Sequence, residues 1–154
     1  MDCHDLLAIT LEACPDAIYV PAHIWTPHFS LFGAFSGFDT IEECYEELTP
    51  QIHALETGLS SDPAMNWRLS ALDSFQLISN SDAHSPAKLG REASLFDIPM
   101  SYAGLYGAIQ RGEGLKGTIE FFPEEGKYHF DGHRKCHLCL SPSQARKYNG
   151  ICPV

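Results

Sequence analysis

Long apolar runs, basic residues and low-complexity segments are all scarce in this sequence. No continuous apolar run reaches the roughly 18 residues that a membrane-spanning helix needs. The N-terminal stretch MDCHDLLAITLEACPD carries acidic residues where a secretory signal would carry basic ones. These absences predict a cytoplasmic protein without a membrane segment.

Basic residues are outnumbered, with 10 lysines and arginines against 20 aspartates and glutamates and a formal net charge of -10. This balance argues against a protein that binds nucleic acid through its overall charge, although a local basic site remains compatible with it. Carboxylates gathered around metal ions would give the same sign of charge.

The chain has 154 residues, 44% of them hydrophobic, which is enough for one domain with a sizeable core. Apolar periodicity and capping residues predict helices over 5–14, 39–48, 63–73 and 101–112, with Asp39 as an N-cap. Short runs rich in β-forming residues predict strands over 17–24, 52–59, 75–80 and 117–123. Strands alternating with helices are typical of βα units, so the predicted fold class is α/β with a parallel sheet.

Side chains suited to metal binding follow the predicted strands. His23 follows the first strand, Glu56 lies near the end of the second, and Asp82 and His84 follow the third. Active sites of α/β folds gather at the C-terminal ends of strands, and mixed carboxylate and imidazole donors suit zinc, manganese or iron. The alternatives are an ordinary hydrogen-bonded His23 and an Asp82 that caps a helix beginning near Pro86.

Two cations follow this motif in the stretch SNSDAHSPAKLGRE. Lys88 and Arg91 would lie in the first turns of the helix expected near Pro86, where a phosphate group is stabilised. The alternative is a solvated helix face, with which Arg91 next to Glu92 is compatible. Metal ligands together with cations favour hydrolysis of a phosphoryl ester by a metal-bound water.

Six cysteines in a cytoplasmic protein favour a metal site over disulfides. Cys136 and Cys139 have the C-x2-C spacing of a zinc knuckle. Cys3, Cys14 and Cys44 lie in helix-like stretches, where we expect buried or half-buried thiols.

The segments PAHIWTP, GLSSDPAMNWRLSALD, SNSDAHSPAKLGRE and GTIEFFPEEGKYHFDGHRKC closely resemble the endonuclease Q family. Members of this family are metal-dependent nucleases of the PHP (polymerase and histidinol phosphatase) type that cut DNA beside deaminated bases. The resemblance covers nearly the whole chain. It implies the C-terminal half of a PHP-type (β/α)7 barrel, about four βα units, in residues 1–128 and an incomplete zinc-ribbon-like segment in 129–154.

The resemblance also implies roles for single residues. His23, Asp82 and His84 match metal ligands that bind Zn, Mn or Mg. Asp82 and Glu56 are the candidate catalytic carboxylates, and Glu56 is assigned to the layer behind the metal ligands or to the substrate side rather than to coordination. Cys152 joins Cys136 and Cys139 as a zinc ligand, and Lys88 and Arg91 remain the phosphate-binding candidates. The expected nucleic-acid contacts are Trp25, His28, Lys127, His133 and Arg134, with His28 standing where the family has an indole.

The family's opening His-x-His strand and the ligands after it have no counterpart here. We therefore expect a fragment that is inactive alone and that pairs with a second copy or with a separate N-terminal half. The alternatives are a non-catalytic fragment that binds nucleic acid or protein, and a PHP-type phosphoesterase that acts on small molecules. Whether this chain is an enzyme by itself stays open at this point.

Overall fold

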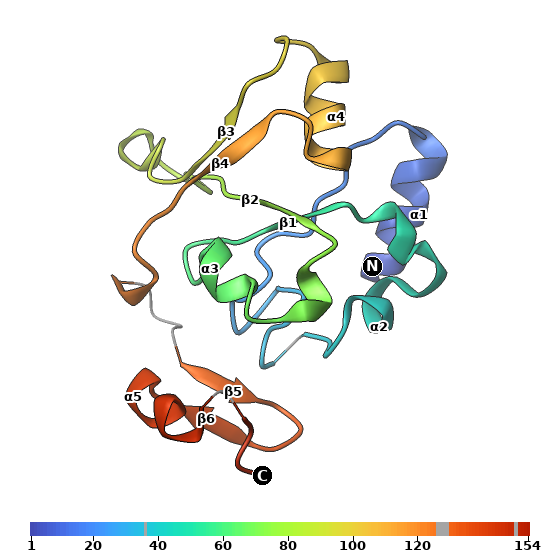
Figure 1. Cartoon of the computed structure of the whole chain (residues 1–154). Helices are drawn as coiled ribbons and strands as arrows, with labels where there is room; N and C mark the ends of the chain where they lie inside the picture. Colours follow the sequence, from blue (N-terminus) through green and yellow to red (C-terminus); the bar gives the residue numbers. More distant parts are fainter. Residues whose placement is uncertain (36, 126–129, 150) are drawn as a thin grey trace.

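Three small two-stranded sheets, rather than one continuous sheet, organise the chain in the computed structural model, which describes residues 1–35, 37–125, 130–149 and 151–154 (Figure 1). The strands are β1 (Ala54–Glu56), β2 (Gln76–Ile78), β3 (Ala93–Phe96), β4 (Leu115–Ile119), β5 (Asp131–His133) and β6 (Leu138–Leu140). The α-helices are α1 (Cys3–Ala13), α2 (Ile41–Tyr45), α3 (Pro63–Asn66), α4 (Tyr102–Arg111) and α5 (Pro142–Ala145). Single 3-10 segments span Glu46–Gln51, Ser70–Leu72, Pro86–Lys88, Pro123–Glu125 and Arg146–Tyr148.

The central sheet is the parallel pair β1 and β2, in which Ala54 lies opposite Gln76 and Glu56 opposite Ile78. The connection between the strands contains α3, which begins at Pro63 and is capped by the Asp62 side chain. A parallel pair with a helical crossover is the arrangement that the alternating pattern predicts. The mixed α/β class is therefore confirmed.

The segment 17–24 is extended but forms no regular ladder. Its backbone runs beside β1, since Glu56 N donates to Pro21 O at 3.0 Å and Ile24 N donates to Glu56 O at 3.2 Å. Proline has no N–H to donate, so Pro21 limits regular pairing at this point. The expected strand is thus an irregular neighbour of β1, and it still brings His23 to the end of that strand.

Side chains alternate across β1, so both faces of the strand are covered. Leu55 belongs to the core cluster under α1 and α2, together with Leu7 and Ile41. Ala54 belongs to a second cluster with Ile78 and Ile109, the latter from α4. In Figure 1, α1 and α2 lie together on one side of the central strands and α4 lies above them. This packing fixes the end of β1, where Glu56 stands.

A sheet of parallel strands was expected, but β3 and β4 pair in antiparallel fashion. Ala93 lies opposite Ile119, and Phe96 lies opposite Leu115. The helix expected near Pro86 is a single 3-10 turn, because the backbone is extended at Leu89 and left-handed at Gly90, with φ 74°. A helix cannot continue through these two conformations, and the chain enters β3 instead.

Two smaller expectations are also corrected. Thr40, not Asp39, caps α2, and its Oγ1 accepts a hydrogen bond from Glu43 N at 3.2 Å. Cys44 is buried as expected, whereas Cys3 and Cys14 are exposed because they lie at the two ends of the surface helix α1.

The C-terminal hairpin β5–β6 and α5 form a small unit beside the body of the molecule (Figure 1). Asp39 connects the two parts, since Arg134 Nη2 lies 3.0 Å from Asp39 Oδ1 and Lys135 Nζ pairs with Asp39 Oδ2. Arg134 also donates to the Gly37 carbonyl. No helix within the described ranges has the length and apolar character that crossing a membrane requires.

Candidate functional site

His23 lies between two carboxylates that come from different elements. Its Nδ1 is 3.4 Å from Glu56 Oε2 at the end of β1, and its Nε2 is 3.7 Å from Asp82 Oδ2 in the loop after β2. The hydrogen bond to Glu56 raises the pKa of His23 above its usual value, against the opposing effect of burial. The structure therefore brings these three sequence-predicted residues together at converging strand ends.

The local backbone explains why His23 and Glu56 meet. Gly58 approaches His23 so closely that a Cβ on it would lie 2.6 Å from His23 Cβ, and its φ of 68° also favours glycine. The Glu56 carboxylate is held on its other side, since Oε1 accepts a hydrogen bond from Asn80 N at 3.1 Å. Glu56 is only 3% exposed, so its position is set by the fold rather than by solvent.

His84 lies beside Asp82 at the surface of the same loop. Its Nδ1 is 2.8 Å from the carbonyl oxygen of Asp82 and 4.0 Å from Asp82 Oδ1. A carbonyl only accepts, so Nδ1 of His84 carries the proton, and in the neutral imidazole Nε2 keeps its lone pair. The His84 side chain is 86% exposed, which leaves that lone pair open to a ligand.

The two proposed phosphate-binding cations differ in their surroundings. Arg91 is half-buried, and its Nε donates to Ser81 O at 2.8 Å while Nη2 lies 3.5 Å from Asp82 O. Lys88 is exposed in the 3-10 turn of the same loop. Arg91 thus contacts the Asp82 loop directly, although not from a helix as expected.

Two further carboxylates lie near this site, and neither was predicted as a site residue. Glu92 is 1% exposed, and Glu120 follows β4, where its Oε2 accepts from Ser79 Oγ at 3.2 Å. Burial, followed by the charge of Glu120, raises the pKa of Glu92 to about 7. Glu92 is therefore not part of a solvated helix face. Glu120 stands between Ile119 and Phe121, and a carboxylate in such an apolar run is a signal that could have revealed it.

The donor set fits a divalent cation. Buried carboxylate oxygens without a hydrogen-bond partner among the described residues include Glu92 Oε2 and Glu120 Oε1. Imidazole nitrogens suit zinc, and carboxylate oxygens suit manganese or magnesium. A different group, His4, Glu46 and Glu47 at the surface beside α1, has ligand atoms that all lie within 4.8 Å of one another. In the described part of the chain no other trio of His, Cys, Asp or Glu meets that distance. In the group of His23, Glu56 and Asp82, the imidazole faces the two carboxylates with different nitrogens.

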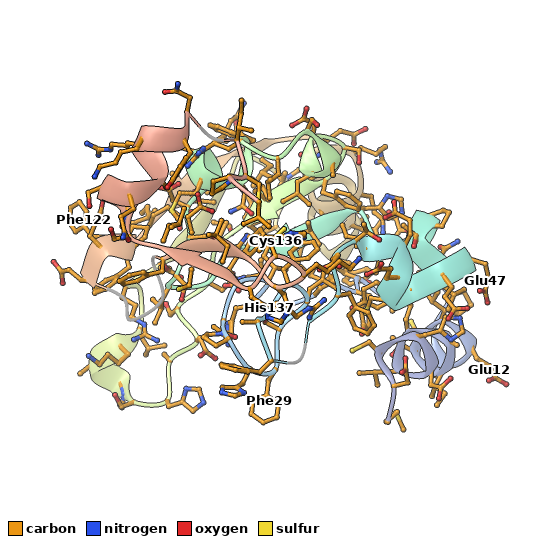
Figure 2. All side chains as sticks on the ribbon, turned by 90° about the horizontal axis from the view of Figure 1, so that it is seen from below. Glu12, Phe29, Glu47, Phe122, Cys136 and His137 are labelled. Atoms are coloured by element: carbon orange, nitrogen blue, oxygen red, sulfur yellow. The ribbon has the colours of Figure 1, made fainter. Side chains whose placement is uncertain are left out.

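The cysteine segment brings some of its expected ligands together. His133 Nδ1 lies 3.1 Å from Cys136 Sγ, and a hydrogen bond with Cys152 raises the pKa of Cys136. Cys139 lies on β6 opposite Gly132 and is exposed. Cys136 and His137 occupy the hairpin turn labelled in Figure 2.

The expected nucleic-acid contacts are dispersed. The indole of Trp25 donates to Asn66 Oδ1 at 2.7 Å and packs on Phe32, so its polar group is engaged within the body. His28 is exposed and stacks on Phe35, and its neighbour Phe29 points outward at the rim of the molecule (Figure 2). Arg134 is held by Asp39, as described above. Lys127 lies outside the described residues.

Comparison with curated proteins identifies two uncharacterized relatives, and no family model matches the chain. A protein of Methanocaldococcus jannaschii is 33% identical over 166 aligned positions, which cover 97% of this chain and 20% of the relative. Protein YqxK of Bacillus subtilis is 31% identical over 129 positions, which cover 82% of this chain and 32% of the relative. The chain thus spans only about a fifth to a third of their lengths.

Two solved structures match almost the whole chain. They are the lesion-specific endonuclease PfuEndoQ from Pyrococcus furiosus, and Endonuclease Q in complex with a 27-mer duplex that has an abasic lesion at the active site. Each has a TM-score of 0.70 and 28% identity, and the match covers 99% of this chain and 38% of the solved one. The chain therefore has an endonuclease Q-like fold that corresponds to part of that enzyme.

Proposed function

We propose that this chain contributes part of a metal-dependent endonuclease site that acts on DNA with deaminated bases. The observation that carries the proposal is His23 placed between Glu56 and Asp82 at converging strand ends of an endonuclease Q-like fold. The abasic duplex at the active site of Endonuclease Q supports damaged DNA as the substrate class.

In this proposal His23, Asp82 and His84 hold a zinc, manganese or magnesium ion. Such an ion lowers the pKa of its bound water and polarises the phosphodiester. Glu56 faces Nδ1 of His23, so it keeps the proton on that nitrogen and leaves Nε2 as the ligand atom. The carbonyl oxygen of Asp82 likewise keeps the proton of His84 on Nδ1 and leaves Nε2 as the ligand atom. Glu56 thus orients a ligand, whereas Asp82 is the carboxylate that faces the reaction.

The finer architecture belongs to the same proposal. Residues 1–128 would be the C-terminal half of a PHP-type barrel, which the parallel pair β1–β2 supports, and residues 129–154 would be the zinc-binding segment. The chain matches 38% of the solved enzyme. We infer that further metal ligands come from a polypeptide that carries the rest of that fold, or from a second copy of this chain.

The experiment that tests the function is complementation of DNA cleavage. The purified chain alone is expected to nick a duplex with one uracil or hypoxanthine very weakly in Mn²⁺. Adding a polypeptide that carries the rest of the fold should raise nicking by about a hundredfold or more, because small misplacements of reacting groups already cost that much. Undamaged duplex is the control substrate, and sedimentation of the chain alone reports any homodimer. Vigorous nicking by the chain alone, or no gain although the two polypeptides bind each other, would contradict the proposal.

Removal of zinc tests the C-terminal segment separately. Cys136, Cys139 and Cys152 are expected to bind about one zinc ion per chain, with His133 as the fourth ligand. Chelation should increase amide hydrogen exchange in β5 and β6 and leave β1 and β2 protected, because the body has its own core. Cys14→Ser, at an exposed cysteine distant in sequence, is the control and should leave the zinc content unchanged. Thiols of Cys136, Cys139 and Cys152 that titrate freely and are unaffected by added zinc would rule out the site.

A further inference from the structure

The loop that carries Asp82 and His84 is closed at its base by side-chain hydrogen bonds. Ser94 Oγ donates to Ser79 O at 2.9 Å, and Ser79 N lies 3.0 Å from the same hydroxyl. Ser81 Oγ donates to Glu92 O at 2.9 Å and accepts from Gly90 N at 2.8 Å. The loop after β2 is therefore tied to the start of β3, and it projects from one side of the body (Figure 1).

Arg91 makes the contacts nearest to the candidate ligands. Its Nε donates to Ser81 O at 2.8 Å, and its Nη2 lies 3.5 Å from Asp82 O. The same Asp82 carbonyl accepts from His84 Nδ1 at 2.8 Å. One guanidinium and one imidazole thus share the carbonyl oxygen that lies between the two ligand side chains.

The backbone at Asp82 needs such support. Its φ is 46°, in the left-handed region that is unfavourable for a residue with a side chain. An aspartate tolerates this conformation better than most residues. The Asp82 side chain does not fix it, because it is 43% exposed and its contacts with the described residues are ion pairs with His23 and His84. Hydrogen bonds to the carbonyls of Ser81 and Asp82, which lie before and after the Asp82 Cα, would hold the turn.

We propose that Arg91 is a positioning residue, which sets the direction of the Asp82 and His84 side chains by holding the carbonyls of Ser81 and Asp82. This inference rests on the proposed metal site and goes beyond it. It replaces the expectation that Arg91 binds a substrate phosphate, because the half-buried guanidinium already donates to the loop. Exposed Lys88, in the same loop, remains free to meet a phosphate.

The two roles of Arg91 predict different measurements. A positioning residue affects metal affinity and kcat, whereas a phosphate-binding residue affects the KM for DNA and leaves the metal affinity unchanged. A lysine at position 91 keeps the charge but lacks the planar fork that reaches two carbonyls, so it should rescue phosphate binding and not positioning.

The test compares Arg91→Gln and Arg91→Lys with Lys88→Gln as the matched control. Both Arg91 variants should weaken Mn²⁺ binding, measured by titration calorimetry, by roughly tenfold to a hundredfold, as losses of partners behind metal ligands do. They should also increase amide exchange over residues 81–84 in the metal-free protein. Lys88→Gln should leave both quantities unchanged. Circular dichroism checks folding, and Arg91→Lys carries the test if Arg91→Gln does not fold.

The contrary results are distinct. Unchanged Mn²⁺ affinity and unchanged exchange in both Arg91 variants, with a higher KM for DNA in the complemented enzyme, would overturn the positioning role. Absence of Mn²⁺ binding by the unaltered chain and its complement would count against the proposed function. In that case amide hydrogen exchange over residues 81–84, compared between the Arg91 variants and the unaltered protein, would by itself decide whether Arg91 holds the loop.

Discussion

Asp82→Asn is expected to abolish metal-dependent cleavage in the complemented enzyme. The Asp82 carboxylate faces His23 Nε2 at 3.7 Å and His84 Nδ1 at 4.0 Å, so its charge lies between the imidazoles of the two other proposed ligands. Stabilisation by a catalytic cation amounts to several kcal/mol, and each ~1.4 kcal/mol is a factor of ten in rate. Loss of this ligand should therefore lower the rate by roughly a thousandfold.

Asparagine is the informative replacement at this position. It keeps the shape of the side chain and tolerates the left-handed backbone at φ 46°, so the loop should keep its conformation. Asp97→Asn, at an exposed carboxylate that pairs with Lys116, is the matched control. Single-turnover nicking of a uracil-containing duplex measures the effect. Equal rates for the Asp82 variant and the unaltered protein would show that the ion is held elsewhere.

Glu92→Gln should make the stability of the metal-free protein fall much less as the pH rises from 5 to 8. Burial and the charge of Glu120 raise the pKa of Glu92 from 4.5 to about 7, so the folded state holds a proton that the unfolded state releases between these values. Stability must then fall as pH rises through that window and stay low above it. A shift of this size corresponds to about 3 kcal/mol.

Glutamine has no charge to titrate. The unfolding free energy of the variant, relative to that of the unaltered protein, should therefore increase from pH 5 to pH 8. Urea titrations in the presence of a chelator measure this difference, and any fixed cost of a buried amide cancels between the two pH values. Glu124→Gln, at an exposed carboxylate, is the control. Parallel pH profiles for Glu92→Gln and the unaltered protein would mean that Glu92 is not buried as an uncompensated acid.

The residues that follow strands were predictable because strand ends can be identified from apolar runs. The runs before Glu56 and Asp82 each end in polar residues, and parallel strands bring such ends to one edge. For this reason the sequence groups His23, Glu56 and Asp82. It does not reveal Glu92, because the stretch KLGREASLF begins with charged residues typical of a solvated surface, whereas in the fold Glu92 directly precedes β3, which pairs with β4, and is buried.

Contacts formed in the fold account for the other differences. Asp39 precedes a helix and carries a carboxylate, as an N-cap does, yet it pairs with Arg134 and Lys135 from the distant hairpin while Thr40 caps α2. The side chain of Asp39 thus suits two partners, and the tertiary structure decides between them. Arg91 differs from expectation through a local contact, since its guanidinium donates to a carbonyl of the preceding loop. Its binding of a phosphate stays a prediction.

The position of a bound Mn²⁺ ion tests the metal centre most directly. Crystals soaked in Mn²⁺ give an anomalous difference peak at each bound ion, without dependence on cleavage. We predict a peak about 2.0 to 2.3 Å from His23 Nε2 and from an Asp82 carboxylate oxygen, with Glu56 remaining on the Nδ1 side of the imidazole. A peak only at the surface group His4, Glu46 and Glu47, with none between His23 and Asp82, would contradict the proposed site.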